Sequence, residues 1–239
     1  SSNLGVVELT LALHYCFDFQ KNSLVWDVGH QGYTHKIVTG RRDNFHTLRQ
    51  KDGISGYIDR EESPYDTFSF GHTGTSLSAG LGLACGQEQD DDKKVVVVIG
   101  DGAIASGMPF EALNHAGESG KNMLVILNDN KMSISPSVGG IAKHLSKIRA
   151  SGPYRDIKKE AQELVSRWHG PLDKLDALYG KISEGVQTAL TPGGLFSELG
   201  FNYFGPVDGH DLSETIDILN HVKRIKEPIL LHTITQKGK

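Results

Sequence analysis

The chain has 239 residues, of which 38% are hydrophobic and 23% are charged, and its formal net charge at pH 7 is −4. A chain of this length and composition can bury a large core, and we expect one α/β domain. No block of Lys or Arg exceeds two residues, which argues against nucleic acid or an anionic membrane surface as the main partner. No apolar stretch reaches membrane-spanning length and the first residues carry no signal-peptide pattern, so we expect a cytoplasmic protein.

The N-terminal third of the chain alternates between helical and strand-like patterns. Ser2 or Asn3 can cap a first helix, and the segment 40–62 is polar and typical of a loop. The predicted elements in chain order are a helix over 4–19, a buried strand over 24–28, a short helix over 31–39, a short strand over 66–70 and a helix of small residues over 77–87.

The middle of the chain reads as a strand–helix–strand unit with polar residues at both strand ends. The run Val95–Ile99 leads into Gly100-Asp101-Gly102, a helical pattern covers 106–119, and the run 123–127 leads to Asn130. Because ligands bind beyond the carboxyl ends of parallel strands, we expect Asp101 and Asn130 to meet in one crevice. Their oxygens suit Mg²⁺, and the glycines allow a diphosphate to approach the backbone. A tight strand-to-helix turn is the structural alternative for Gly-Asp-Gly.

The C-terminal part of the chain resumes the alternation of strands and helices after a region of different composition. The stretch 136–192 is rich in charged residues, and we expect a variable helical insertion outside the sheet. The fold then resumes over 195–204, followed by a turn over 205–210, a helix over 212–225 with Asp211 or Ser213 as its cap, and a last strand over 228–235. The whole pattern predicts a mostly parallel sheet flanked by helices on both faces.

Two of the eleven histidines stand out by position. His30 and His72 each follow a glycine at the end of a predicted strand, and we expect both to face the same crevice as Asp101. Imidazoles there could bind an anionic diphosphate or carry protons near neutral pH. The alternative for each is a histidine that bonds to a turn carbonyl, and His210 is interpreted as part of a helix cap.

Several motifs in order resemble the first domain of the 1-deoxy-D-xylulose-5-phosphate synthase family, and the resemblance covers nearly the whole chain. It is weakest over 136–192, where that family carries a variable segment. The motifs are WDVGHQ (26–31), KIVTGRR (36–42), GDGA (100–103), FEALNHAG (110–117), NDNKMSIS (128–135), F-x-ELGF (196–201) and GPVDGHD (205–211).

The resemblance implies a thiamine-diphosphate-binding fold and a diphosphate-binding domain over 1–239. It implies a Mg²⁺-dependent homodimeric transferase that joins pyruvate to D-glyceraldehyde 3-phosphate, releases CO2 and serves isoprenoid and thiamine biosynthesis. By similarity, the metal ligands are Asp101, Asn130 and Met132, the last through its carbonyl. Also by similarity, the cofactor contacts are His30, Gly71, His72, Thr73, Gly102, Ala103 and Asn130, with His30 and His72 as catalytic proton carriers.

Two departures from the family pattern qualify these expectations. Family members usually show two serines after the histidine, where this chain has Thr73 and Gly74. The family also uses a histidine just upstream of this opening and a glutamate in a following domain, so we expect a fragment of a longer enzyme that is inactive alone. The role of Lys237 stays open. Another transketolase-like thiamine-diphosphate enzyme and a non-catalytic scaffold subunit are the alternatives.

Overall fold

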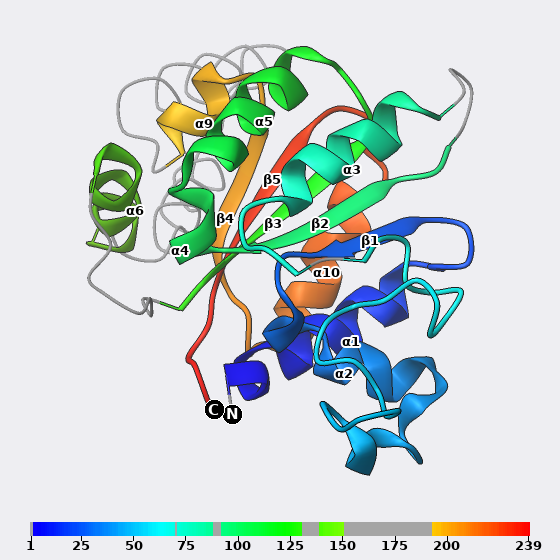
Figure 1. The fold of residues 1–239 in the computed structure, drawn as a ribbon. Coiled ribbons are helices and arrows are strands. Elements are labelled where there is room, and N and C mark those ends of the chain that lie inside the picture. Colours follow the sequence, from blue (N-terminus) through cyan, green and yellow to red (C-terminus); the bar gives the residue numbers. More distant parts are fainter. Residues whose placement is uncertain (1, 70, 88–91, 131–138, 151–192) are drawn as a thin grey trace, which may run out of the picture.

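The computed structural model describes residues 2–69, 71–87, 92–130, 139–150 and 193–239. The strands within these ranges form one parallel five-stranded sheet in the order β1-β2-β3-β5-β4 (Figure 1). They are β1 (Ser23–Trp26), β2 (Val95–Gly100), β3 (Met123–Asp129), β4 (Asn202–Asp208) and β5 (Ile229–Ile234). The continuous apolar runs of β2 and β3 place them inside the sheet, because a strand covered on both faces needs apolar side chains at every position.

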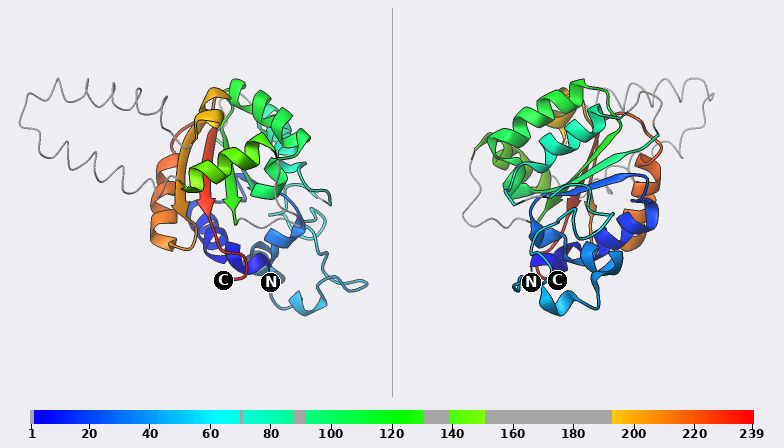
Figure 2. Two further views of the ribbon diagram at one scale, coloured as in Figure 1. Left: turned by 90° about the vertical axis from the view of Figure 1, so that its left-hand side faces the viewer. Right: turned by 45° about the vertical axis from the view of Figure 1, so that its right-hand side comes forward.

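Helices cover both faces of the sheet and divide the core into two apolar clusters. One face packs against α1 and α10, and the other packs against α3, α5, α6 and α9 (Figures 1 and 2). The α-helices are α1 (Val7–Cys16), α2 (Tyr33–Lys36), α3 (Ser76–Cys85), α4 (Asp101–Ile104), α5 (Gly107–Glu118), α6 (Gly140–Ala150), α9 (Gly194–Glu198) and α10 (Leu212–Val222). The 3-10 helices are η1 (Ser2–Val6), η2 (Gly29–Gln31) and η4 (Phe45–Thr47), and η3 (Ile37–Arg41) is a π-helical turn.

The small residues of α3 divide between the sheet and the surface. A Cβ at Gly80 would lie 2.4 Å from a methyl carbon of Val97, whereas a Cβ at Gly82 would meet nothing within 4 Å. Gly80 therefore lets α3 press closely against β2, and Gly82 lies on the exposed face of the helix. Within the described ranges, no helix combines the length and the apolar character needed to cross a membrane.

The two ends of the described chain lie side by side, next to η1 (Figures 1 and 2). A Cβ at Gly5 would lie 2.6 Å from the carbonyl oxygen of Gln236, so only glycine permits this approach. The segment that follows β5 is thereby placed against the start of the chain.

The first helix and the first strand are shorter than predicted. The predicted helix over 4–19 is a 3-10 turn followed by α1, which ends at Cys16. Asn3 does not cap it, because its side chain bonds instead to Thr34 at 2.8 Å and to the backbone N–H of Tyr33 at 2.9 Å. The strand predicted to reach Val28 ends at Trp26.

The strand predicted over 66–70 is wrong for its described residues, 66–69, which adopt no strand. The N–H of Asp66 donates to the carbonyl of Ser63 at 3.0 Å, which is a turn bond. Its carboxylate is taken up by Arg41 and His35. Asp66 is therefore buried through its ion pairs, whereas Phe68 and Ser69 are exposed.

The turn predicted over 205–210 is also wrong in its first half, because β4 runs through Gly205 and Pro206 to Asp208. The pairing of β4 with β5 shifts register between Phe204 and Val207, and Gly205 has φ +116°. The strand thus accommodates Pro206 at an irregularity on the edge of the sheet. The predicted cap of α10 is confirmed, since Asp211 accepts from the N–H of Glu214 at 2.9 Å.

The predicted variable stretch 136–192 lies mostly outside the described residues. Its described part contains α6, whose Leu145 and Ile148 are buried in the core cluster shared with α9.

Candidate functional site

The carboxyl ends of β1, β2 and β3 lie next to one another and carry the predicted polar residues. Gly100 pairs with Asn128 across β2 and β3, so Asp101 and Asn130 follow directly from adjacent strand ends. Asp101 is buried as the first residue of α4, and Asn130 is half-buried. The fold therefore places two of the three predicted metal ligands directly after adjacent strands, and the third, Met132, lies outside the described residues.

The residues predicted to be backbone donors, Gly102 and Ala103, lie in the first turn of α4. Gly102 is exposed and Ala103 is half-buried, and no side chain caps the N-terminus of this short helix. N–H groups in a first helical turn have no partner within the helix. In the ranges that the structure describes, no group of three or more His, Cys, Asp or Glu side chains could hold a metal ion.

Gln31 bridges the ends of β1 and β3 and passes over β2. Its Oε1 accepts from Asn128 Nδ2 at 2.9 Å, and its Nε2 donates to the carbonyl of Asp27 at 3.2 Å. A Cβ at Gly100 would lie 3.8 Å from Gln31 Nε2, in ordinary van der Waals contact. Sequence patterns did not identify Gln31 or Asn128 as site residues, because their role arises from strands distant in sequence.

Asp27 fixes the loop that carries His72. Its buried carboxylate accepts from the N–H of Gly74 at 2.9 and 3.0 Å and from the N–H of Ser76 at 3.3 Å. The exposed Thr73 adds a hydroxyl donor at 3.1 Å. A single carboxylate after β1 therefore holds the loop 71–76 at the entrance to α3.

Gly74 fits this loop because of its backbone conformation. Its φ is +79°, and a Cβ there would lie 2.7 Å from Ser106 Oγ. The glycine that replaces the family serine thus stands at a position with a left-handed backbone, a conformation that residues other than glycine rarely adopt. In this chain, Gly74 contributes a backbone donor to Asp27 rather than a hydroxyl.

His30 lies in a strained and closely packed segment. Val28 has φ +64°, which is unusual for a β-branched residue and costs about 1–3 kcal/mol. The next residue, Gly29, is so close to the loop that a Cβ would lie 2.0 Å from the carbonyl oxygen of Gly56. Strain of this kind persists only where the surroundings impose it, and it fixes the direction in which η2 leaves β1.

The environment of His30 favours a neutral imidazole. Burial and then the positive charge of Lys237 lower its pKa, against an opposing effect of Asp27. The charge of Lys237 therefore acts on His30, while the role of Lys237 in the site stays open. His30 is half-buried at the end of β1.

His72 is exposed and its ring is oriented by the adjacent backbone. Nδ1 lies 2.7 Å from the carbonyl oxygen of Thr73 and must carry a proton to donate to it. A neutral His72 therefore presents Nε2 as an acceptor. This bond corresponds to the structural alternative, a histidine bonded to a turn carbonyl. Asp27 holds the loop of His72 by hydrogen bonds and acts on His30 through its charge, whereas the placement of both histidines relative to Asp101 stays a prediction.

A buried ionic cluster beside the site was not predicted. Its members are Lys36, Arg41, Glu62, Asp66 and His35, with His14 bonded to His35 at 2.9 Å. Burial alone would raise the pKa of Asp66, but bonds from His35 and Arg41 outweigh burial and lower it to about 2. The cluster anchors the segment 33–66, whose Gly56 packs on Gly29.

His210 is also placed differently from its prediction. It does not cap α10, because Asp211 does. Its Nε2 instead accepts from the N–H of Gln236 at 2.8 Å, and its Nδ1 lies 3.3 Å from a carboxylate oxygen of Glu8. His210 thus joins α1 to the segment that carries Lys237.

Comparisons with known proteins relate the chain to one enzyme family. The family model described as 1-deoxy-D-xylulose-5-phosphate synthase matches residues 1–235. The chain is 51% identical over its whole length to the 1-deoxy-D-xylulose-5-phosphate synthase of Alkaliphilus oremlandii and 52% identical to that of Pseudomonas fluorescens, strain Pf0-1. It spans 38% and 37% of the length of these relatives.

The solved structures extend the likeness at the level of fold. A transketolase from Leishmania mexicana matches 98% of this chain and 32% of its own with a TM-score of 0.62 and 16% identity. A transketolase mutant from Pichia stipitis gives a TM-score of 0.63 at 17% identity. These matches support the predicted thiamine-diphosphate-binding α/β fold.

Proposed function

Because the chain belongs to the 1-deoxy-D-xylulose-5-phosphate synthase family, we propose that it contributes the diphosphate- and magnesium-binding half of a thiamine-diphosphate site. The observation that carries the proposal is the position of Asp101 and Asn130 after the adjacent strands β2 and β3. Carboxylate and amide oxygens are ligands that Mg²⁺ prefers, and Mg²⁺ completes its shell with waters and phosphate oxygens.

The donors around these two residues fit the group. Gly102 and Ala103 follow Asp101 in the first turn of α4, where backbone N–H groups suit an anionic diphosphate. Gly71, Thr73 and the two histidines would make the remaining contacts, and the carbonyl of Met132 would be a further metal ligand.

The reaction proposed for the whole enzyme joins pyruvate to D-glyceraldehyde 3-phosphate. The bond between C1 and C2 of pyruvate breaks, CO2 leaves, C2 forms a bond to the aldehyde carbon, and the former aldehyde oxygen takes up one proton to give 1-deoxy-D-xylulose 5-phosphate. When bound, thiamine diphosphate supplies the electron sink that decarboxylation requires.

The two histidines are proposed to move protons. His30 is suited to accept one near neutral pH, because burial and Lys237 lower its pKa. His72 would use Nε2, since its Nδ1 donates to the carbonyl of Thr73. Asp27 would hold the His72 loop in place without contacting substrate.

The domain and assembly expectations belong to the same proposal. Residues 1–239 would form a single diphosphate-binding domain, with 136–192 as its variable insertion, in a cytoplasmic homodimer. The homodimer is supported by the outward face of α3, which carries the small residues Ser78, Gly82 and Cys85. Sedimentation velocity over a concentration series tests the homodimer, and cell fractionation tests the cytoplasmic location.

A chimera tests the reaction. The chain would replace the matched segment of the Alkaliphilus oremlandii relative, which is 51% identical to it. We expect release of CO2 from pyruvate only when D-glyceraldehyde 3-phosphate is added, loss of this activity in Asp101→Ala, and retention in the surface control Asp217→Ala. A folded chimera that releases CO2 equally well from pyruvate alone, or that prefers a ketose phosphate, would support another transketolase-like enzyme instead. A folded but inactive chimera with an active parent would favour a scaffold.

A further inference from the structure

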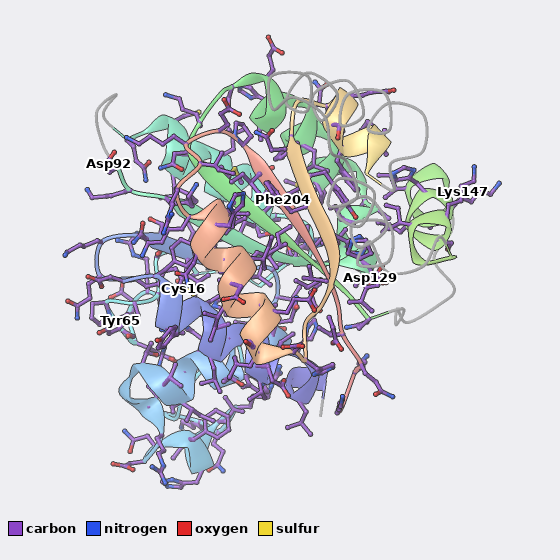
Figure 3. The ribbon with its side chains drawn as sticks, turned by 180° about the vertical axis from the view of Figure 1, so that it is seen from behind. Cys16, Tyr65, Asp92, Asp129, Lys147 and Phe204 are labelled. Carbon is purple, nitrogen blue, oxygen red and sulfur yellow. The ribbon has the colours of Figure 1, made fainter. Side chains whose placement is uncertain are left out.

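A buried chain of hydrogen bonds ends at the residue next to Asn130. The carboxylate of Asp129 lies 3.0 Å from His232 Nε2, and the hydroxyl of Tyr203 lies 2.8 Å from His232 Nδ1. Asp129 and His232 are both fully buried. Asp129 is the last residue of β3 and lies beside the ends of β4 and β5 (Figure 3).

The direction of these bonds follows from the groups involved. A carboxylate only accepts, so His232 donates to it through Nε2–H. The other ring nitrogen of a neutral His232 is then an acceptor, and the Tyr203 hydroxyl donates to it. Burial and the charge of Asp129 raise the pKa of Tyr203, so its hydroxyl stays protonated. Each donor in these two hydrogen bonds thus faces a matching acceptor.

The partners of Asp129 are themselves held rigidly. The Tyr203 ring stacks on Phe196 of α9 with centroids 6.0 Å apart and an interplanar angle of 4°. Gly205 lies against His232, because a Cβ on Gly205 would be 2.4 Å from the His232 carbonyl oxygen. The irregular part of β4 therefore packs directly on the residue that holds Asp129.

The side chain on the opposite face of β3, next to Asp129 in the strand, is also held by hydrogen bonds. Side chains alternate across a strand, so Asn128 points away from Asp129. Asn128 donates to Gln31 and accepts from the Thr235 hydroxyl at 2.6 Å, while the N–H of Thr235 donates to the carbonyl of Asp129 at 3.0 Å. The two residues that precede Asn130 are therefore held from both faces of the sheet.

We infer that His232 and Tyr203 are positioning residues that fix Asn130 at the candidate site through Asp129. The inference rests on the proposed function for the identity of the ligand that Asn130 meets. A purely apolar contact at this point would pack the core equally well but would not set the direction of the strand end. Residues one step removed from a metal commonly tune its affinity in this way.

Tyr203→Phe is the test variant, because it removes the hydroxyl and keeps the ring on Phe196. Tyr15→Phe, on the exposed face of α1, is its control. Residue-resolved amide hydrogen exchange is measured in the chain without cofactor. We expect the amides of Asn128, Asp129 and Asn130 to exchange about fivefold faster in Tyr203→Phe relative to those of β2, which corresponds to the loss of one hydrogen bond.

His232→Phe provides a second variant with a larger expected effect, and the Mg²⁺ concentration that supports thiamine diphosphate binding provides a second readout. We expect that concentration to rise about tenfold in His232→Phe, with Tyr15→Phe unchanged. Uniform acceleration across β2 and β3, or none, would overturn the positioning role. Faster local exchange in a chain whose wild type binds no cofactor would support the positioning role and refute the proposed function.

Discussion

Asp27→Ala tests whether one carboxylate organises the loop of His72. In the wild type, Asp27 accepts from two buried backbone N–H groups, those of Gly74 and Ser76, and from the exposed Thr73 hydroxyl. Alanine would leave the two N–H groups without an acceptor, at about 1–3 kcal/mol each. The Thr73 hydroxyl can turn to water and adds little.

The sum predicts that Asp27→Ala lowers the free energy of unfolding by about 2–5 kcal/mol. The upper end lies below twice the single-bond maximum because the bond from Ser76 is long, at 3.3 Å. Asp27→Asn keeps one acceptor oxygen but loses the charge, and we expect about half of that loss. Asp217→Ala, on the exposed face of α10, is the matched control and is expected to change the free energy by no more than about 0.5 kcal/mol.

Urea titration followed by circular dichroism measures these differences, with an unchanged m-value as the condition for comparison. The His72 ring signals in NMR report on the loop in parallel, and they should broaden or shift in Asp27→Ala. A loss below about 1 kcal/mol, or one no larger than in the control, would refute the view that Asp27 holds this loop.

Two further predictions concern packing and pH. Gly80→Ala should destabilise the chain by about 1–3 kcal/mol, because its Cβ would lie 2.4 Å from a side chain of β2. Gly82→Ala in the same helix should instead stabilise the chain by up to about 1 kcal/mol. Equal effects of the two substitutions in thermal unfolding would contradict this packing. Burial and then a neighbouring histidine lower the pKa of His14 from 6.5 to about 4. The unfolded chain therefore binds a proton at higher pH than the folded chain, and stability should fall as the pH falls from 6.5 to 4. His14→Gln should flatten this slope in urea titrations, and the exposed His46→Gln should leave it unchanged; the same slope in both variants would sink the argument.

The sequence predicted the structure best where short local patterns determine it. The continuous apolar runs of β2 and β3 predicted two buried strands, and the polar residues that end them predicted the edge where Asp101 and Asn130 lie. The Asp211 cap and the helices α3 and α5 follow local rules in the same way.

Features that depend on tertiary contacts could not be predicted. The pattern over 66–70 resembled a strand, but the buried carboxylate of Asp66 is bonded to Arg41 and His35, which are more than twenty residues away. Pro206 indicated a turn, yet an irregular edge strand accommodates it. Gln31 became a bridge only because β1 and β3 flank β2 in the sheet.

The measurement that tests the central claim most directly is a ³¹P NMR titration of thiamine diphosphate with the chain, with and without Mg²⁺. This method detects millimolar affinity, so a half-site remains visible. We predict Mg²⁺-dependent broadening of the diphosphate signals that is lost in Asp101→Ala and retained in Asp217→Ala. Signals unaffected by the wild-type chain, or broadened equally by the Asp101→Ala variant, would contradict a magnesium–diphosphate site at the ends of β2 and β3.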